Sequence, residues 1–495
     1  MNLAKAFRGA ARTHAGKIAV YWGEEEITYD ALLASTFSVA SRLERDFKVR
    51  PGDRVALWMK NCPEFIPAYF GILFAGGVVV SVNNFLKADE VKFILDDAGV
   101  NIVICDASLD EQAAKLAVLR PETKFLLADG FLREPASQAE ISDPQSSIGD
   151  LAVLIYTSGT TGKPKGAMLS HGNLLSNVES CRQVLAAVDH DRFVVLLPMF
   201  HSFMMTVGVL LPLLVGGSLL LIKSVNPPKN VIAEILQRRA TILPAVPPFF
   251  RALAQVPMPP DFPLRLCISG GAPLPAEILS EFTARMPLPL LEGYGLSEAS
   301  PVCSMNPIKG PWKHGSIGVP IPDVEMSVQD DQGKFLADGE NGEICVRGGN
   351  VMLGYWNQPE ETARTMRDGW LLTGDVGHRD NDGYFFITDR KKDMLLVNGI
   401  NVYPRQIEEV IYQFPGVKEA AVIGVPDPRR GEQPLAFVAA SDGASIDAKA
   451  LQQFLRERLA DYKVPKRIVV MPALPRNATG KILKPELKKL ALCTN

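Results

Sequence analysis

The chain of 495 residues is 47% hydrophobic and 22% charged, the composition of an ordinary globular protein that is long enough for at least two domains. Its 52 basic and 55 acidic residues give a formal net charge of -3, so no positive field favours nucleic acid as a partner. The seven cysteines are scattered without a Cys-x-x-Cys pair, which predicts a reducing compartment and argues against a structural zinc site.

The N-terminus carries basic residues but no continuous apolar segment of signal-peptide length, so we expect a cytoplasmic protein. Up to residue 150, short apolar runs alternate with helical patterns, which predicts an α/β fold. An apolar helix over Pro63 to Phe74 leads into a strand, as in a parallel sheet covered on both faces. The strands expected here are Arg54 to Trp58, Gly77 to Val82, Val100 to Cys105 and Lys124 to Leu127.

The segment Tyr156 to Gly166 has the composition of a phosphate-binding loop. It follows the apolar strand Leu151 to Ile155 and contains four Ser or Thr hydroxyls, three glycines and two lysines. Glycines allow backbone N–H groups to converge on an anion, hydroxyls add donors, and lysines supply positive charge. The Gly-x-x-x-x-Gly-Lys-Ser/Thr pattern of a Walker loop is absent, so another phosphate-binding fold is required. An ordinary surface loop is the alternative.

His201 follows an expected buried strand, Phe193 to Leu197, at the kind of strand end where ligands collect in α/β sheets. The residues alone leave two interpretations open, a core histidine or a site residue. The apolar segment Phe203 to Ile222 resembles a membrane span but contains a Gly-Gly pair. We therefore expect a buried helix as far as Val215 and a buried strand from Ser218, with membrane insertion as the alternative.

Two glycine-containing segments follow expected strands further along the chain, Ser269 to Leu274 and Gly293 to Glu298. We expect both to be loops at strand ends, where glycine lets a ligand approach the backbone. Tyr294 offers a flat ring on which adenine can stack, and Glu298 offers a hard oxygen ligand for Mg2+. The segment Gly369 to Asp375 is expected to be a β-turn region, in which the Asp375 carboxylate can accept hydrogen bonds from ribose.

A dense charge run, Asp389 to Asp393, lies between two expected strands. By itself it is typical of a solvated turn. We place a domain boundary here, with residues 1–390 in an N-terminal domain and 391–495 in a C-terminal one. The strands and helices expected beyond it form a small α+β domain able to act as a lid. Near its end, the polar turn Pro475 to Lys481 presents a single lysine.

Five ordered segments, 156–166, 293–298, 370–375, 390–393 and 475–481, together resemble the signature of the adenylate-forming superfamily. This superfamily includes acyl-CoA synthetases, luciferases and the adenylation domains of peptide synthetases. The resemblance covers Ile18 to Lys489 and is most like bacterial long-chain fatty acid–CoA ligases. It implies a large N-terminal domain of layered α/β subdomains that binds ATP and the acid, followed by a small mobile α+β C-terminal domain.

The resemblance also implies which residues hold the nucleotide and its metal ion. Glu298 and Thr157 are the implied Mg2+ ligands, and Ser297 keeps the hydroxyl of the threonine that is usual in its place. The implied nucleotide-binding residues are Thr157, Ser158, Gly159, Thr160, Thr161, Gly162, Lys163 and Lys165 for the phosphates, Gly271, Ala272, Pro273, Gly293, Tyr294, Gly295 and Ser297 around adenine, and Asp375 and Arg390 at the ribose.

For catalysis, the resemblance implies Lys481 as the lysine that neutralises charge in the transition state and Lys392 as the hinge of the C-terminal domain. Asn398 and Gly399 are implied to border the tunnel for the pantetheine thiol of coenzyme A. His201, in the motif beside the acid, stands where amino-acid-activating members carry aspartate. This difference argues against an amino acid substrate.

The implied reaction joins a medium- to long-chain fatty acid to AMP and then transfers the acyl group to coenzyme A. An aryl-CoA ligase acting on benzoates or cinnamates shares every ATP motif and stays open as an alternative. A fatty acyl-AMP ligase that loads a carrier protein is disfavoured, because such enzymes usually carry an insertion ahead of the hinge and Asp375 to Arg390 is compact. Peripheral contact with the inner face of a membrane and homodimerisation also stay open.

Overall fold

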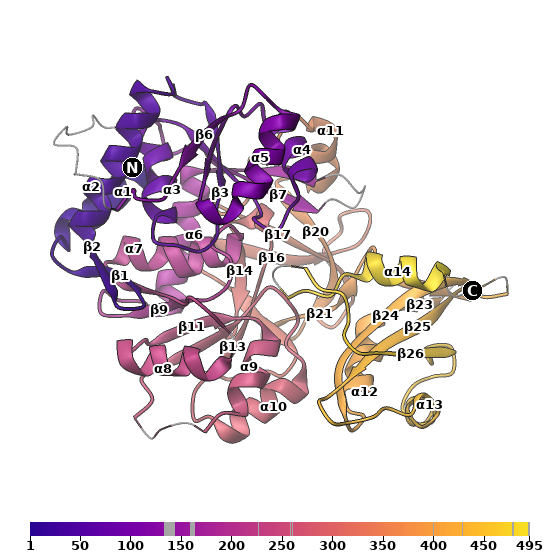
Figure 1. The fold of residues 1–495 in the computed structure, drawn as a ribbon. Coiled ribbons are helices and arrows are strands. Elements are labelled where there is room, and N and C mark those ends of the chain that lie inside the picture. Colours follow the sequence, from indigo (N-terminus) through magenta and orange to yellow (C-terminus); the bar gives the residue numbers. More distant parts are fainter. Residues whose placement is uncertain are drawn as a thin grey trace.

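A computed structural model describes residues 1–132, 144–158, 164–225, 227–257, 259, 261–398, 400–427, 429–477 and 480–493. Residues up to about 390 form a large body, and the remainder forms a smaller one beside it, drawn in light orange and yellow (Figure 1). The N-terminal body contains two large sheets and the smaller body contains a third.

The first sheet has seven strands in the order β18-β8-β7-β4-β3-β5-β6. Strands β3 to β7 pair in parallel, whereas β8 and β18 complete the edge in antiparallel fashion. The predicted strands are confirmed here, and two of them have the predicted bounds. The strands are β3 (Arg54–Trp58), β4 (Val78–Ser81), β5 (Ile102–Cys105), β6 (Lys124–Leu127), β7 (Leu151–Ser158), β8 (Pro164–Ser170) and β18 (Gly354–Tyr355).

The second sheet has fourteen strands, which pair in parallel in one half of the sheet and in antiparallel fashion in the other. Its parallel half is β1 (Ile18–Trp22), β9 (Arg192–Val195), β10 (Ser218–Leu221), β11 (Ile242–Ala245), β12 (Leu266–Ser269) and β13 (Leu290–Gly295), with β2 (Glu25–Thr28) at the edge. Its antiparallel half is β14 (Val302–Met305), β15 (Ser316–Pro320), β16 (Val324–Gln329), β17 (Gly342–Gly348), β19 (Met366–Arg367), β20 (Trp370–Arg379) and β21 (Phe385–Arg390).

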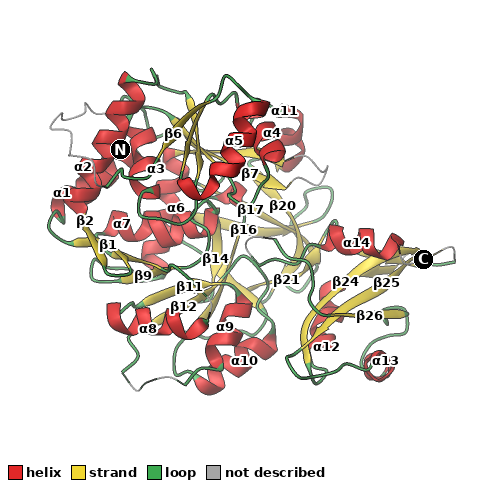
Figure 2. Cartoon of the chain, viewed as in Figure 1, coloured by secondary structure: helices red, strands yellow, loops and turns green. Residues whose placement is uncertain are grey.

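Helices cover both faces of these sheets (Figure 2). The largest core packs residues of α1 (Leu3–Thr13), α2 (Tyr29–Arg45), α3 (Phe65–Phe74), α6 (His171–Val184) and α7 (Leu211–Val215) against strands of both sheets, so these helices form a shared middle layer. The outer face of the first sheet carries α4 (Ala88–Ala98) and α5 (Asp110–Leu119). The outer face of the second carries α8 (Pro228–Arg238), α9 (Pro247–Ala254) and α10 (Ala276–Arg285).

The apolar segment that resembles a membrane span is part of the core. Met204–Leu210 form a π-helix that continues into α7, and Gly216 ends the helix in a left-handed conformation before β10. The predicted helix, turn and buried strand are confirmed, although the π-helical form was not expected. Among the described residues, no helix is both long enough and apolar enough to cross a membrane.

The third sheet has five strands, β22 (Leu395–Val397), β23 (Ile400–Val402), β24 (Val417–Asp427), β25 (Gly431–Ala440) and β26 (Arg467–Met471). One face packs on α12 (Pro404–Tyr412) and α13 (Ala448–Arg456), and the other packs on α14 (Lys484–Cys493). All of its strands follow Asp393, as expected for a separate lid. The boundary between residues 390 and 391 itself stays a prediction.

Three segments that we expected to be loops or turns are strands. Gly293 to Gly295 continue β13, because their backbones pair with β14 in antiparallel register. The two ends of the phosphate-loop segment, Tyr156 to Ser158 and Pro164 to Gly166, pair with each other as parts of β7 and β8. The segment Gly369 to Asp375, expected to be a turn region, enters the strand β20, which pairs with β17. In each case pairing across the sheet overrides the local turn signal of glycine.

Candidate active site

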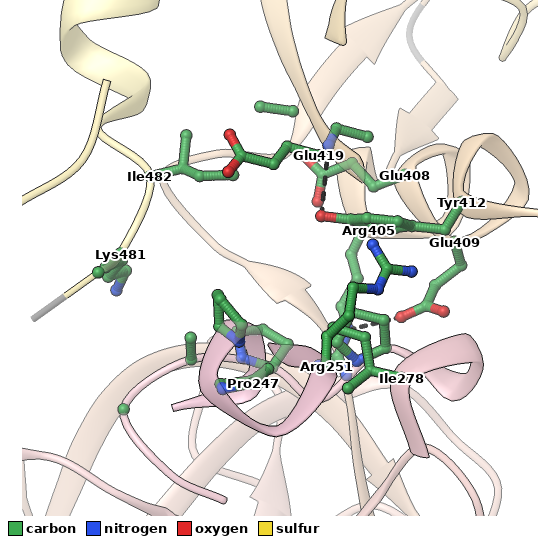
Figure 3. Close-up of a pocket in the computed structure, with 18 of the residues that line it drawn as sticks. Pro247, Arg251, Ile278, Arg405, Glu408, Glu409, Tyr412, Glu419, Lys481 and Ile482 are labelled. Atoms are coloured by element: carbon green, nitrogen blue, oxygen red, sulfur yellow. Dashed lines mark hydrogen bonds and ion pairs between the residues drawn. The ribbon is translucent and has the colours of Figure 1, made fainter. Parts of the chain in front are cut away.

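A cavity of about 780 Å³ lies between the large body and the C-terminal sheet. Its walls bring together residues from distant parts of the sequence, and Figure 3 shows Lys481 on one side with Arg405 and Glu409 on the other. The sequence-predicted residues that line it are Gly271, Ala272, Pro273, Gly293, Tyr294, Gly295, Asp375, Arg390 and Lys481. The turn after β12, the end of β13 and the pair β20–β21 therefore meet the polar turn of the C-terminal body.

Asp375 is the centre of a buried polar cluster in this cavity. One carboxylate oxygen accepts a hydrogen bond from the Tyr294 hydroxyl at 2.6 Å, and the other accepts one from Arg390 Nε at 2.7 Å. Asp375 and Arg390 face each other because β20 and β21 pair in that register. The Asp375 residue is 4% exposed, and its charge raises the pKa of Arg390. This cluster fixes the ring of Tyr294 relative to the arginine.

Glu298 lies in a short 3-10 turn, Ser297–Ala299, and accepts hydrogen bonds from two hydroxyl groups. Its Oε1 atom accepts hydrogen bonds from Thr157 at 3.4 Å and from Tyr355 at 2.9 Å. The described residues contain no cluster of three or more His, Cys, Asp or Glu that could hold a metal ion by itself. One carboxylate with a neighbouring hydroxyl nevertheless fits Mg2+, because this ion is commonly held by one or two carboxylates together with substrate phosphates.

Lys165 lies at the start of β8 with its side chain almost fully buried. Its ammonium group pairs with Glu361 of α11 (Pro359–Thr365) and lies 5.5 Å from the centre of the Tyr355 ring. The sequence alone did not single out Tyr355 or Glu361. Five predicted phosphate-loop residues, Gly159, Thr160, Thr161, Gly162 and Lys163, lie outside the described residues, and Ser158 is described only as the end of β7.

His201 begins the segment that leads into the π-helix. Its Nδ1 atom accepts a hydrogen bond from the Phe203 backbone N–H at 3.3 Å. Since Nδ1 is an acceptor, the neutral ring carries its proton on Nε2 and can donate from that atom. Loss of hydration and the nearby charge of Lys481 lower the pKa of His201 to about 4, so the ring is neutral at pH 7. Next to it, the hydroxyls of Ser202 and Ser297 are 3.0 Å apart.

Two hydrogen bonds tie the Lys481 backbone to Asn477. The Asn477 N–H donates to the Lys481 carbonyl at 2.9 Å, and Asn477 Oδ1 accepts from the Lys481 N–H at 2.8 Å. The Lys481 residue as a whole remains exposed, but the cavity walls remove part of its hydration. This desolvation and the charge of Arg390 lower the pKa of Lys481 to about 8. The amine is therefore protonated at neutral pH but holds its proton weakly.

The remaining predicted residues lie outside the described lining of the cavity. Lys392 follows β21, where desolvation and the charge of Arg390 lower its pKa. Asn398 is exposed, has a left-handed backbone with φ of 53°, and donates its N–H to the Arg430 carbonyl at 2.8 Å. Gly399 lies outside the described residues.

Several charged residues of the cavity wall were missed by the sequence interpretation. Glu292 is buried, and its Oε1 accepts the Leu274 N–H at 3.0 Å, directly after the turn 271–273. Burial raises the pKa of Glu292 to about 7, although the charge of Arg405 opposes the shift. Asp389, Glu408 and Lys484 also line the wall. The sequence signal for these residues is their position next to motif residues, since Glu292 precedes Gly293 and Asp389 precedes Arg390.

Comparisons with known proteins give a consistent result. The family model of AMP-binding enzymes matches residues 7–356, and that of the AMP-binding enzyme C-terminal domain matches residues 406–481. A long-chain-fatty-acid–CoA ligase of Bacillus subtilis is 36% identical over 95% of this chain and 91% of its own. A feruloyl-CoA synthase of an Amycolatopsis species is 40% identical over 97% of both chains. The ATP-bound structure of MatB from Rhodopseudomonas palustris is 35% identical, superimposes with a TM-score of 0.91 and covers 99% of both chains.

Proposed function

The chain belongs to the AMP-binding enzyme family as an AMP-forming acid–CoA ligase, and from that premise we propose that it activates a medium- to long-chain fatty acid. ATP and coenzyme A are its co-substrates, with Mg2+ as is typical of the family. The choice of a fatty acid is supported by the named fatty acid ligases among its relatives. It is also supported by the apolar, buried residues that follow His201 in the π-helix.

The observation that carries the proposed mechanism is the placement of Lys481 in the same cavity as Tyr294, Asp375 and Arg390. A carboxylate is a poor electrophile until one of its oxygens is bonded to phosphorus. Its attack on the α-phosphorus of ATP breaks the bond to pyrophosphate and brings the negative charges of the carboxylate and the α-phosphate together. A protonated lysine held at this position compensates the charge where it develops. The neutral His201 ring, with its donor on Nε2, orients the acid for the attack.

The adenosine is proposed to lie along the turn 271–273, with its base against the Tyr294 ring. Both oxygens of Asp375 already accept one hydrogen bond each, from Tyr294 and Arg390. A carboxylate oxygen has two lone-pair sites, so Asp375 retains capacity for the two ribose hydroxyls. The existing contacts thus orient the carboxylate and leave a lone-pair site on each oxygen for the ribose.

The phosphates are proposed to bind between the loop 157–165 and Glu298. Magnesium, when bound there, neutralises the triphosphate and polarises the α-phosphate. The hydroxyls of Thr157 and Tyr355 both donate to Glu298 Oε1, which fixes the direction of the carboxylate. Lys165 adds positive charge once it exchanges its contact with Glu361 for a phosphate oxygen.

After the acyl-AMP has formed, the C-terminal domain, residues 391–495, is proposed to turn about Lys392. This rotation withdraws Lys481 and brings the segment at Asn398 and Gly399 to the acid site. The thiol of coenzyme A then attacks the acyl carbon, AMP leaves, and a thioester forms.

An aryl acid of the hydroxycinnamate type is the second candidate substrate. Two observations favour it, the similarity to feruloyl-CoA synthases and the edge-to-face pair of Phe85 and Phe200, whose ring centres are 6.5 Å apart. Phe85 is 62% exposed and adjoins the residue before His201, so the pair offers an aromatic surface near the proposed acid site.

The test is pyrophosphate and AMP release by the purified protein with ATP, Mg2+ and a panel of acids from acetate to palmitate, benzoate and ferulate, each with and without coenzyme A. The proposal predicts coenzyme A-dependent turnover that peaks on straight-chain acids of medium or greater length. A peak on ferulate or benzoate contradicts the fatty acid assignment and supports the aryl one. Pyrophosphate release without thioester formation when coenzyme A is present contradicts both and points to a carrier-protein acceptor.

A further inference from the structure

Asp389 makes an unusual connection between the two bodies of the molecule. It is the penultimate residue of β21 and is 4% exposed. One carboxylate oxygen accepts the N–H of its neighbour Arg390 at 2.7 Å, whereas the other accepts the N–H of Arg405 at 2.8 Å. Arg405 is the second residue of α12, so the two donors lie on opposite sides of the proposed hinge at Lys392.

Helix α12 depends on this contact for capping. The first N–H groups of a helix have no partners within the helix and usually obtain one from the preceding side chain. The residue before α12 is Tyr403, which makes no such bond, and the first helical residue is Pro404, which has no N–H to donate. Asp389 therefore supplies the N-terminal cap of α12 from a strand of the large sheet.

The same cluster continues to the lysine turn. Lys484, three residues after Lys481, forms an ion pair of 2.8 Å with Glu408 of α12. The charge of Lys484 favours the ionised form of Asp389, although burial dominates and raises the pKa of Asp389 to about 6. A chain of contacts thus runs from Asp389 through α12 to the start of α14 and the turn that presents Lys481. Figure 3 shows Arg405 on the side of the cavity opposite Lys481.

We propose that Asp389 is a positioning residue for the adenylation step, because its cap on α12 holds the C-terminal domain in the orientation that places Lys481 in the cavity. This inference rests on the proposed function of Lys481. A rotation about Lys392 carries α12 away from β21 and breaks the cap. Asp389 therefore favours acyl-AMP formation and makes no contribution to the thioester-forming orientation.

The expected effect follows from the ordinary strength of a helix cap, which corresponds to roughly a 2- to 30-fold change in an equilibrium constant. Asp389→Ala is expected to lower the rate of acid-dependent ATP–pyrophosphate exchange by a factor in this range. The rate of thioester formation from synthetic acyl-AMP and coenzyme A is expected to stay within about twofold of the wild-type rate. General damage to the fold would lower both rates, so a loss of exchange with retention of thioester formation identifies an effect on the adenylation orientation.

A second pair of variants isolates the N–H donor without touching Asp389. Arg405→Ala keeps the backbone N–H and removes the side chain, whereas Arg405→Pro removes both, at a first-turn position where proline is tolerated. Arg405→Pro is expected to lower exchange further than Arg405→Ala, again without a matching loss of thioester formation. This pair also separates the cap from the contact between Asp389 and Arg390.

Asp447→Ala is the matched control, since Asp447 caps α13 of the same domain through the Lys449 N–H at 2.9 Å. Within the part of the chain that the structure describes, no hydrogen bond or ion pair joins Asp447 to the large sheet. It is expected to leave the ratio of the two half-reactions unchanged. The inference is overturned if Asp389→Ala and Arg405→Pro keep wild-type exchange, or if they lower both half-reactions equally. Absence of acid-dependent exchange in the wild-type protein overturns the proposed function instead.

Discussion

Replacement of Asp375 by asparagine tests the polar cluster of the cavity most sharply. The substitution keeps the shape of the side chain but removes the charge that pairs with Arg390 and replaces one acceptor oxygen by an NH2 group. Tyr294 and Arg390 can then no longer both donate to this side chain, because each donates to a different oxygen at 2.6 and 2.7 Å, and Arg390 loses its ionised partner. Asparagine also has less capacity to accept two ribose hydroxyls.

The size of the effect follows from the burial of these groups. Hydrogen bonds to charged groups contribute about 1.5–3 kcal/mol each, and the Arg390 side chain remains 35% exposed, which places the loss near the lower end. We expect Asp375→Asn to lower the free energy of unfolding by about 1–2 kcal/mol. The affinity for AMP is expected to fall roughly ten- to a hundredfold, because the bonds to ribose also involve the charge.

Urea unfolding measures the first quantity and titration calorimetry with AMP measures the second. Tyr294→Phe is the matched control, since it removes one hydroxyl but keeps the ring and the ion pair between Asp375 and Arg390. It is expected to reduce AMP affinity less than Asp375→Asn does. Wild-type stability together with wild-type AMP affinity in Asp375→Asn would contradict the assigned role of the Asp375 charge in the cluster and at the ribose.

Three further predictions concern other parts of the site. Glu298→Gln is expected to raise the Mg2+ concentration needed for half-maximal pyrophosphate release about tenfold with little change in AMP affinity; an unchanged requirement contradicts the assignment of Glu298. Burial raises the pKa of Glu292 to about 7, so the native state binds the proton more tightly than the unfolded chain and wild-type stability falls as pH rises from 5 to 7. Between these pH values the free energy of unfolding of the wild type is expected to fall by about 1–3 kcal/mol, whereas that of Glu292→Gln is expected to lack this decline. Urea titrations at pH 5 and 7 measure both, and an equal decline in the two proteins contradicts the raised pKa of Glu292. The Phe203 N–H donates to His201, so we place the Phe203 ring at the proposed acid site. A Cβ atom at Gly270 would lie 3.0 Å from this ring, so Gly270→Ala is expected to shift the ranking of acids in the panel while AMP affinity stays unchanged; an unaltered ranking contradicts a role of this ring in acid selection.

The sequence was most informative where the local pattern of residues is compatible with few kinds of secondary structure. Arg54–Trp58 and Lys124–Leu127 were predicted with their bounds, because each is a short, mostly apolar run bounded by turn residues. The first is buried from Val55 to Trp58, whereas the second is an edge strand with Leu127 exposed. The Gly-Gly interruption likewise identified the turn after Val215. The glycines at the end of β13 misled the interpretation, since Gly293 and Gly295 pair with the antiparallel strand β14 although their local signal is that of a loop.

The site was predictable only in part, for a related reason. Lys481, Asp375 and Arg390 were identified by their motifs, and the structure places them in one cavity. Their partners were not identified, because Tyr355, Glu361 and Asp389 acquire their importance from contacts between distant segments. Tyr355 reaches Glu298 through the pairing of β18 with β8, and Asp389 reaches α12 through the packing of two bodies. No spacing along the chain encodes these contacts.

The most direct test of the account is acid-dependent pyrophosphate release without coenzyme A, measured for the wild-type protein and for Lys481→Ala. We expect release by the wild type and a roughly hundred- to thousandfold lower rate for the variant, with AMP affinity and unfolding free energy preserved. The wild-type rate is expected to fall as pH rises past about 8, where the free enzyme loses the ammonium charge of Lys481. A variant that releases pyrophosphate at the wild-type rate, while remaining acid-dependent, would contradict the central claim that Lys481 activates the acid.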